Sequence, residues 1–223
     1  NDTINVANAV DFQVSGGVET IDGGAGTDTL AFINAEGITL TAPELSKLVG
    51  IEKITLAHAA PGSLTFGNET FTSLGASSLQ ITTSTGDSTT VVDGSAVSNG
   101  AFVIVDNGSN DNNDTLTGGT GDDIFRFSST TGLTATDVIT GNGGSDTIQV
   151  DNTAAVTVDV DFANVKTVEN ITVMKSAAVA TTTGALDIQI APAAGTLNAG
   201  AVTVDMSAKS DATNSLFNTG ATS

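Results

Sequence analysis

Apolar and polar residues alternate over short runs along most of the chain. The runs are ITLTA (38–42), ITLAHA (54–59), LQITTST (79–85), VTVDVDF (156–162), ITVMKSA (171–177), LDIQIA (186–191) and VTVDMSA (202–208). A period of two is typical of a β-strand with one buried face. Only APELSKLVG (42–50) indicates a helix, of one or two turns beginning at Pro43, a residue suited to the first helical position. The pattern therefore predicts an all-β chain.

Four landmarks occur twice in the same order. NDTIN (1–5) matches NDTLT (113–117), GTDTLAF (26–32) matches GSDTIQV (144–150), LVGIEKITL (48–56) matches NVKTVENITV (164–173), and VVDGSA (91–96) matches TVDMSA (203–208). Self-similarity of this kind is typical of repeat architectures. We predict two tandem units, 1–112 and 113–223, taken from a longer array. The first would hold degenerate glycine loops (1–31) and a β spacer (32–112), and the second a loop block (113–150) and a β spacer (151–223).

A glycine-rich nonapeptide stands out within these units. The segments 23–31 (GGAGTDTLA) and 118–126 (GGTGDDIFR) fit G-G-x-G-x-D-x-U-x at every specified position, where U is a large apolar residue. The segment 141–149 (GNGGSDTIQ) departs only at its second position. Three further acidic residues, Glu19, Asp114 and Asp137, each precede the aspartate of one of these motifs by nine residues.

This spacing predicts calcium bound between stacked turns. Glycines permit a positive φ and allow carbonyl oxygens to point inward, stacked strands lie about 4.8 Å apart, and Ca²⁺ takes about six to eight oxygen ligands. The alternative is the same turns without metal; a phosphate loop would instead need a following lysine and helix. The predicted metal-site residues are Glu19, Asp22, Gly23, Gly24, Gly26, Asp28, Asp114, Gly118, Gly119, Gly121, Asp122, Asp123, Asp137, Gly141, Asn142, Gly144 and Asp146.

The two units are unequal in this respect. Aligned at the offset of the first landmark, Asp11 falls on Asp123, but VANAVD (6–11) replaces the glycine loop. We expect fewer or weaker sites in the first unit, centred on Asp28, and a fuller set in the second. Glu52 and Glu169 occupy matching places and are weaker candidates, the alternative being a solvated or lysine-paired side chain.

The net charge of the chain limits the classes of partner that it can bind. The formal net charge is −19, with only six lysines and arginines, which argues against nucleic acid and anionic membranes, since both attract basic surfaces. No apolar run approaches the ~20 residues of a membrane span.

Cysteine is absent and His58 is the single histidine, so a zinc site of the usual kind lacks ligands. No nucleophile motif is found, and the threonine-rich stretch 82–90 is better explained as an exposed strand than as an ice-binding lattice. We expect no enzymatic activity.

With these motifs the chain resembles RTX (repeats-in-toxin) proteins. The segment 125–150 is similar to the sequence that follows the glycine repeats in that family, and the VEN-I-T-V and VD-x-SA elements resemble spacers of its large surface-layer and matrix members. The resemblance implies parallel β-roll blocks continuous with β-helix or β-solenoid spacers, with β-sandwich spacers as the alternative. It also implies type I secretion from a Gram-negative bacterium, an extracellular or cell-surface location, and folding outside the cell on binding several calcium ions. The expected partners are calcium and copies of the same protein in a lattice or filament. The alternatives are an accessory region of a secreted enzyme and an adhesin stalk.

Overall fold

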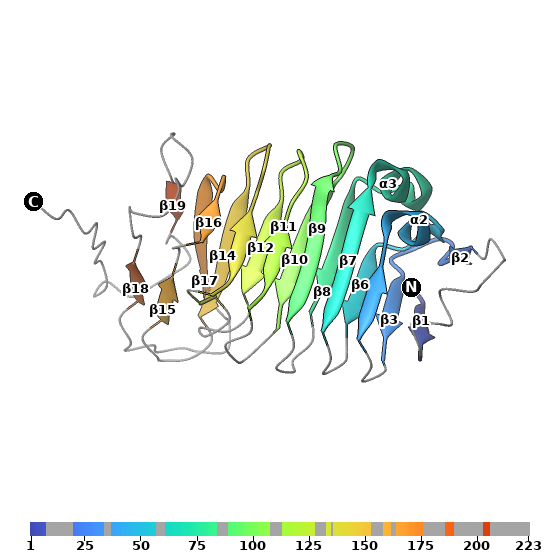
Figure 1. Ribbon diagram of the computed structural model, residues 1–223, viewed down its shortest axis with the longest axis horizontal. Coiled ribbons are helices and arrows are strands. Elements are labelled where there is room, and N and C mark those ends of the chain that lie inside the picture. The colour runs from blue at the N-terminus through green and yellow to red at the C-terminus, as the bar shows by residue number, and fades with distance from the viewer. Residues whose placement is uncertain are drawn as a thin grey trace, which may run out of the picture.

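The fold is a parallel β-solenoid, seen in a computed structural model (Figure 1). The structure describes residues 1–7, 20–33, 37–56, 61–83, 89–107, 113–127, 133–134, 136–152, 158–161, 164–175, 186–189 and 203–205. Every strand pair in these ranges is parallel. The all-β solenoid expected from the sequence is confirmed, and the spacer strands continue the same coil rather than forming a sandwich.

Two long sheets form the walls of the solenoid. The nine-stranded sheet contains, in spatial order, β1 (Thr3–Val6), β3 (Thr29–Phe32), β6 (Lys53–Leu56), β8 (Ser78–Thr82), β10 (Ala101–Asp106), β12 (Ile124–Phe127), β14 (Thr147–Asn152), β17 (Asn170–Lys175) and β19 (Thr203–Asp205). The six-stranded sheet contains β16 (Val165–Lys166), β13 (Val138–Thr140), β11 (Thr115–Thr117), β9 (Thr90–Ala96), β7 (Gly62–Gly67) and β4 (Ile38–Leu40). Two short pairs complete the strands: β2 (Ile21–Asp22) with β5 (Leu48–Val49), and β15 (Val158–Asp161) with β18 (Leu186–Gln189).

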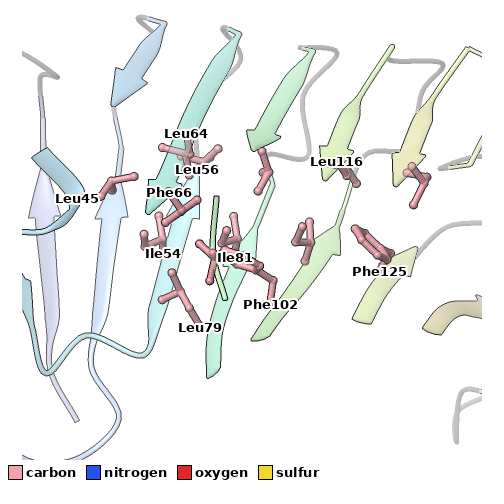
Figure 2. Close-up of a cluster of buried hydrophobic side chains, with 14 of the residues drawn as sticks. Leu45, Ile54, Leu56, Leu64, Phe66, Leu79, Ile81, Phe102, Leu116 and Phe125 are labelled. Atoms are coloured by element: carbon pink, nitrogen blue, oxygen red, sulfur yellow. The ribbon is translucent and has the colours of Figure 1, made fainter. Parts of the chain in front are cut away.

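The core lies between the two sheets. Where the structure describes the side chains, inward-pointing residues of the strands form one continuous apolar column, which includes Ile54, Ile81 and Phe125 of the nine-stranded sheet (Figure 2). Leu30 and Ile104 belong to the same column, opposite Ile54 and Ile81 in the strand register. All five side chains are fully buried. The alternation in the sequence therefore records which side of each strand faces the core.

In the described part of the chain, two helices interrupt the coils near the N-terminal end (Figure 1). The helix α2 (Ala42–Leu45) is one turn long, within the predicted one or two turns, and begins one residue before Pro43 at a capping box formed by Thr41 and Glu44. The helix α3 (Asn68–Leu74) was not expected from the sequence. Its Phe71 packs edge-on against Phe102 with ring centroids 5.2 Å apart, so packing against the core stabilises a segment of modest helix propensity.

The repeated landmarks occupy two kinds of position. GTDTLAF and GSDTIQV both lead into the nine-stranded sheet, as do the matching segments around Glu52 and Glu169. NDTIN forms β1 in the nine-stranded sheet, whereas NDTLT forms β11 in the six-stranded sheet. In the structure Asp2 therefore stands where Asp123 stands in the later coils. The unit boundary at residues 112 and 113 remains a prediction.

Candidate functional site

The three glycine loops lie on one edge of the solenoid, where the chain passes to the nine-stranded sheet. We call this the glycine edge; it holds the loops Gly23–Asp28, Gly118–Asp123 and Gly141–Asp146, which lead into β3, β12 and β14. The strand register places the last residue of each loop opposite its counterpart in the next coil. Acidic residues therefore form a column parallel to the solenoid axis.

Carboxylates of this column cap the main chain of the coil before. Each accepts a hydrogen bond from the backbone N–H one coil earlier, 21 to 26 residues away along the chain. The bonds run from Asp2 N–H to Asp28, from Asp28 N–H to Glu52 (2.8 Å), from Phe102 N–H to Asp123 (2.6 Å), from Asp123 N–H to Asp146 (2.8 Å) and from Asp146 N–H to Glu169 (2.8 Å). Hydrogen bonds to an ionised acceptor are about twice as strong as neutral ones. This carboxylate ladder ties successive coils together.

The ladder is interrupted in the middle of the solenoid. The position opposite Glu52 is Leu79, and the one after that is Phe102. Both side chains are fully buried, and α3 occupies this part of the edge instead of a glycine loop. Coils in this stretch are joined by apolar packing in place of carboxylates.

The first glycine of each loop is required by the aspartate five residues later. A Cβ on Gly118 would stand 2.1 Å from Asp123 Oδ2, and one on Gly141 would stand 2.2 Å from Asp146 Oδ2. Both distances are far below van der Waals contact, so a side chain and the folded-in carboxylate exclude one another. The glycines carry an entropic cost on folding, and the amide caps made by the buried aspartates offset part of it.

The loop Gly118–Asp123 is closed on itself. Asp123 Oδ1 accepts from Phe102 N–H, and Oδ2 accepts from Gly119 N–H at 2.8 Å, so both carboxylate oxygens have partners. No residue of Gly118–Asp123 has a positive φ. We call this the closed loop.

The loops Gly23–Asp28 and Gly141–Asp146 differ from it, and we call them the open loops. Their second residues, Gly24 (φ 81°) and Asn142 (φ 73°), are left-handed. The amide of Gly24 donates to Asp22 Oδ1 (2.8 Å) and that of Asn142 to Thr167 Oγ1 (2.7 Å). As a result, the Oδ2 atoms of the two loop aspartates, Asp28 and Asp146, are buried and have no hydrogen-bond partner.

On the opposite edge of the solenoid, a shorter series of carboxylates also accepts hydrogen bonds from backbone N–H groups of the preceding coil. Thr90 N–H donates to Asp114 (2.6 Å), and Asp114 N–H donates to Asp137 (2.8 Å). Asp137 also accepts from the backbone of Thr134 (2.7 Å). Acidic residues nine apart in the sequence, such as Asp114 and Asp123, thus lie on opposite edges and build two separate columns.

Burial changes the acidity of three of these aspartates. Desolvation raises the pKa of Asp114 and of Asp146 to about 7, and that of Asp123 to about 6. Asp146 faces the charges of Asp123, Glu169 and Asp122, which raise its pKa further. The two backbone N–H donors of Asp123 oppose the effect of burial, whereas Asp146 has a single such donor.

The remaining predicted residues have structural roles on the glycine edge. Asp122 Oδ1 accepts from Ser145 N–H (2.8 Å), and Asn142 Nδ2 donates to Gly118 O (2.8 Å). Gly26 and Gly144 have φ values of 131° and 110°. Gly121 lies against Gly100 O, where a Cβ would stand 2.6 Å away. Glu19, Asp11 and His58 lie outside the described residues.

Sequence reasoning missed Asp2, whose backbone N–H donates to the first carboxylate of the ladder, and two backbone positions. Asp2 shares with Asp28 and Asp146 the pattern of an aspartate followed by threonine and an aliphatic residue, and this pattern could have found it. Gly50 (φ 57°) and Thr167 (φ 50°) are left-handed residues in the turns that follow the open loops. Nothing in the local sequence of Thr167 indicates that conformation, because a β-branched residue rarely adopts it.

Comparisons of the chain with protein-family models, with curated proteins and with solved structures found no match. Within the described ranges, no group of three or more His, Cys, Asp or Glu side chains is arranged to hold a metal ion. In the same part of the chain, no helix is long and apolar enough to cross a membrane. Any cation on the glycine edge would therefore depend on main-chain oxygens as well as on carboxylates.

Proposed function

We propose that this chain is a calcium-dependent structural segment of an exported bacterial surface-layer or matrix protein. In this proposal it folds outside the cell when calcium binds, and it associates with copies of itself. The resemblance of its glycine loops to RTX repeats motivates the proposal. The elongated solenoid agrees with a structural role, because stacked coils build length without needing a catalytic cleft.

One observation carries the calcium part of the proposal. Asp28 and Asp146 each keep a buried oxygen without any hydrogen-bond donor, and burying an ionised oxygen in this way is unfavourable. The chain carries 25 acidic residues against six basic ones, so a proton or a cation is the available compensation. A bound divalent ion would supply charge neutralisation at these oxygens.

The donor chemistry of the glycine edge fits calcium. The available ligands are carboxylate and main-chain carbonyl oxygens, which are the hard ligands that Ca²⁺ prefers, at variable geometry. Thiolates are absent from the chain, and its one histidine cannot form a usual zinc site. The residues present therefore favour Ca²⁺ over transition metals.

Thermal unfolding followed by circular dichroism tests this proposal. We expect calcium at a hundred times its dissociation constant to stabilise the fold by about 2.7 kcal/mol for each ion bound. For a chain of this size that corresponds to a rise in Tm of roughly 5–10 °C over the chelated protein. Magnesium at the same concentration is the matched control and should give a smaller rise, because it demands near-octahedral geometry. Identical melting in calcium and in chelator would refute the calcium dependence.

The structural role needs a separate test. Negative-stain images of the calcium-loaded protein should contain sheets or filaments that disappear on chelation. Single extended particles without lateral contacts would instead favour a stalk.

A further inference from the structure

We infer that the cation sites of the glycine edge lie at the open loops and exclude the closed loop, although the closed loop fits the nonapeptide at every specified position. Each site is shared between an open loop and the short turn of the following coil, Gly50–Glu52 in one case and Thr167–Glu169 in the other. These turns carry no glycine motif. The inference deepens the proposed function and rests on it.

The two sites share one hydrogen-bonding pattern, and they differ in that the N-terminal ammonium of Asn1 stands 3.6 Å from Asp28 Oδ1. In each, the loop aspartate uses Oδ1 to cap the coil before, and its own N–H donates to a glutamate of the coil after, Glu52 for Asp28 and Glu169 for Asp146. The remaining Oδ2 atom is buried and has no donor in both cases. The same arrangement thus occurs twice, near the two ends of the described solenoid.

A main-chain oxygen of the following turn approaches each of these places. A Cβ on Gly141 would stand 2.1 Å from Thr167 O and 2.2 Å from Asp146 Oδ2, so the two oxygens converge on the same point. A Cβ on Gly23 would stand 2.2 Å from Gly50 O and 2.7 Å from the Asp28 Cβ. The residues that supply these carbonyls, Gly50 and Thr167, are both left-handed. A left-handed threonine is strained, and such strain is typical of functional sites.

The closed loop also has a main-chain oxygen of the following coil nearby, since a Cβ on Gly118 would stand 2.8 Å from Gly141 O, but its carboxylate oxygen already has a donor. Asp123 Oδ2 accepts from Gly119 N–H, so binding a cation there would require breaking that bond. In the open loops the corresponding amides, of Gly24 and Asn142, donate to other acceptors. The direction of the second-residue amide therefore decides which loop keeps a carboxylate oxygen for a cation.

Substitution of aspartate by asparagine separates the two kinds of loop. In Asp28→Asn and Asp146→Asn the amide oxygen can still accept the N–H that Oδ1 accepts, whereas the charge and the unpartnered oxygen are lost. Calcium binding by the full chain is measured by equilibrium dialysis. We expect each of these variants to bind one ion fewer than the parent, and the double variant two fewer.

The matched control is Asp123→Asn, which should bind as many ions as the parent. Retention of the full number of ions by Asp146→Asn would overturn the inference, as would loss of an ion from a folded Asp123→Asn. If Asp123→Asn does not fold, the counts for Asp28→Asn and Asp146→Asn decide alone. A parent that binds no calcium would refute the proposed function, and the inference with it. A parent that binds calcium through Asp123 would refute the inference alone.

A second measurement works without metal. In chelator, Asp146→Asn should melt at the same temperature as the parent or higher, because its Nδ2 can donate toward Thr167 O. Asp146→Ala should melt lower, since it loses the cap on Asp123 N–H. Equal destabilisation by both substitutions would mean that Asp146 Oδ2 is already satisfied, and would contradict the inference.

Discussion

The closed loop and the open loops have nearly the same sequence and different hydrogen bonding. GGTGDD and GNGGSD stack directly on one another, with Asp123 N–H donating to Asp146. In the closed loop both aspartate oxygens accept amides, and in the open loop one oxygen has no donor. The difference originates in one amide, that of the second residue of the loop. A motif thus specifies the path of the backbone, while the neighbouring coil specifies which ligand atoms stay available.

The largest expected effect tests what the loops have in common. Gly141→Ala and Gly118→Ala should each destabilise the protein by about 3–5 kcal/mol, because the new Cβ overlaps the buried carboxylate and forces an amide cap to break. Urea unfolding in chelator measures this.

The control for this prediction is Gly143→Ala in the same open loop. Its Cβ would meet nothing closer than 3.6 Å, so we expect a change within about 1 kcal/mol. Similar destabilisation by Gly143→Ala and Gly141→Ala would show that the clash with the aspartate is not what requires the first glycine.

A smaller effect, on pH dependence, separates the closed loop from the open one. The folded-state pKa values of Asp146 (about 7) and Asp123 (about 6) lie above the ordinary value of 3.8, so the folded state binds more protons than the unfolded state between pH 4 and 7. In the metal-free protein, these two aspartates therefore make their full contribution to the free energy of unfolding below about pH 4. That contribution decreases as the pH rises to 7. Urea midpoints in chelator at several pH values measure this loss.

Asp146→Asn should flatten this curve most between pH 6 and 7, because it removes the group that titrates there. Asp114, whose pKa is also raised to about 7, accounts for a remaining slope in that variant. A curve for Asp146→Asn that runs parallel to the parent curve would contradict the assignment of a raised pKa to the open-loop aspartate.

The smallest expected effect concerns the second residue of the loop. Asn142→Gly relieves a left-handed conformation, worth about 1–2 kcal/mol for a non-glycine residue, and loses the hydrogen bond from Nδ2 to Gly118 O, worth about 1 kcal/mol. The net change in the free energy of unfolding should stay within about 1 kcal/mol, with calcium binding unchanged. Loss of a bound ion in this variant would show that the Asn142 side chain is itself part of the site.

The strands were predictable because their alternation reflects burial directly. Ile54 and Ile81 are apolar residues between polar neighbours, and each points into the core. The helix α3 was not predictable in the same way. NETFTSL has no strong helical pattern, and its helix depends on Phe71 meeting Phe102, which is supplied by a later coil.

The glycine edge was predictable as a place but not in its hydrogen bonding. The nonapeptide located Asp28, Asp123 and Asp146 on one edge, and their burial follows from the glycine that leaves room for each. The acceptor that decides whether a loop is open can lie a full coil away, as Thr167 lies 25 residues from Asn142. No local pattern in the sequence encodes such a pair.

Because the ladder is interrupted at Leu79 and Phe102, different parts of the solenoid respond differently to pH and to ions. Junctions made by carboxylates weaken or strengthen with pH and ions, whereas a junction made of aromatic and aliphatic side chains does not. On chelation the stretch around α3 should persist as a nucleus while the coils on either side fray. Hydrogen exchange would then find the slowest amides in the middle of the stack, from which both ends could regrow when the ions return.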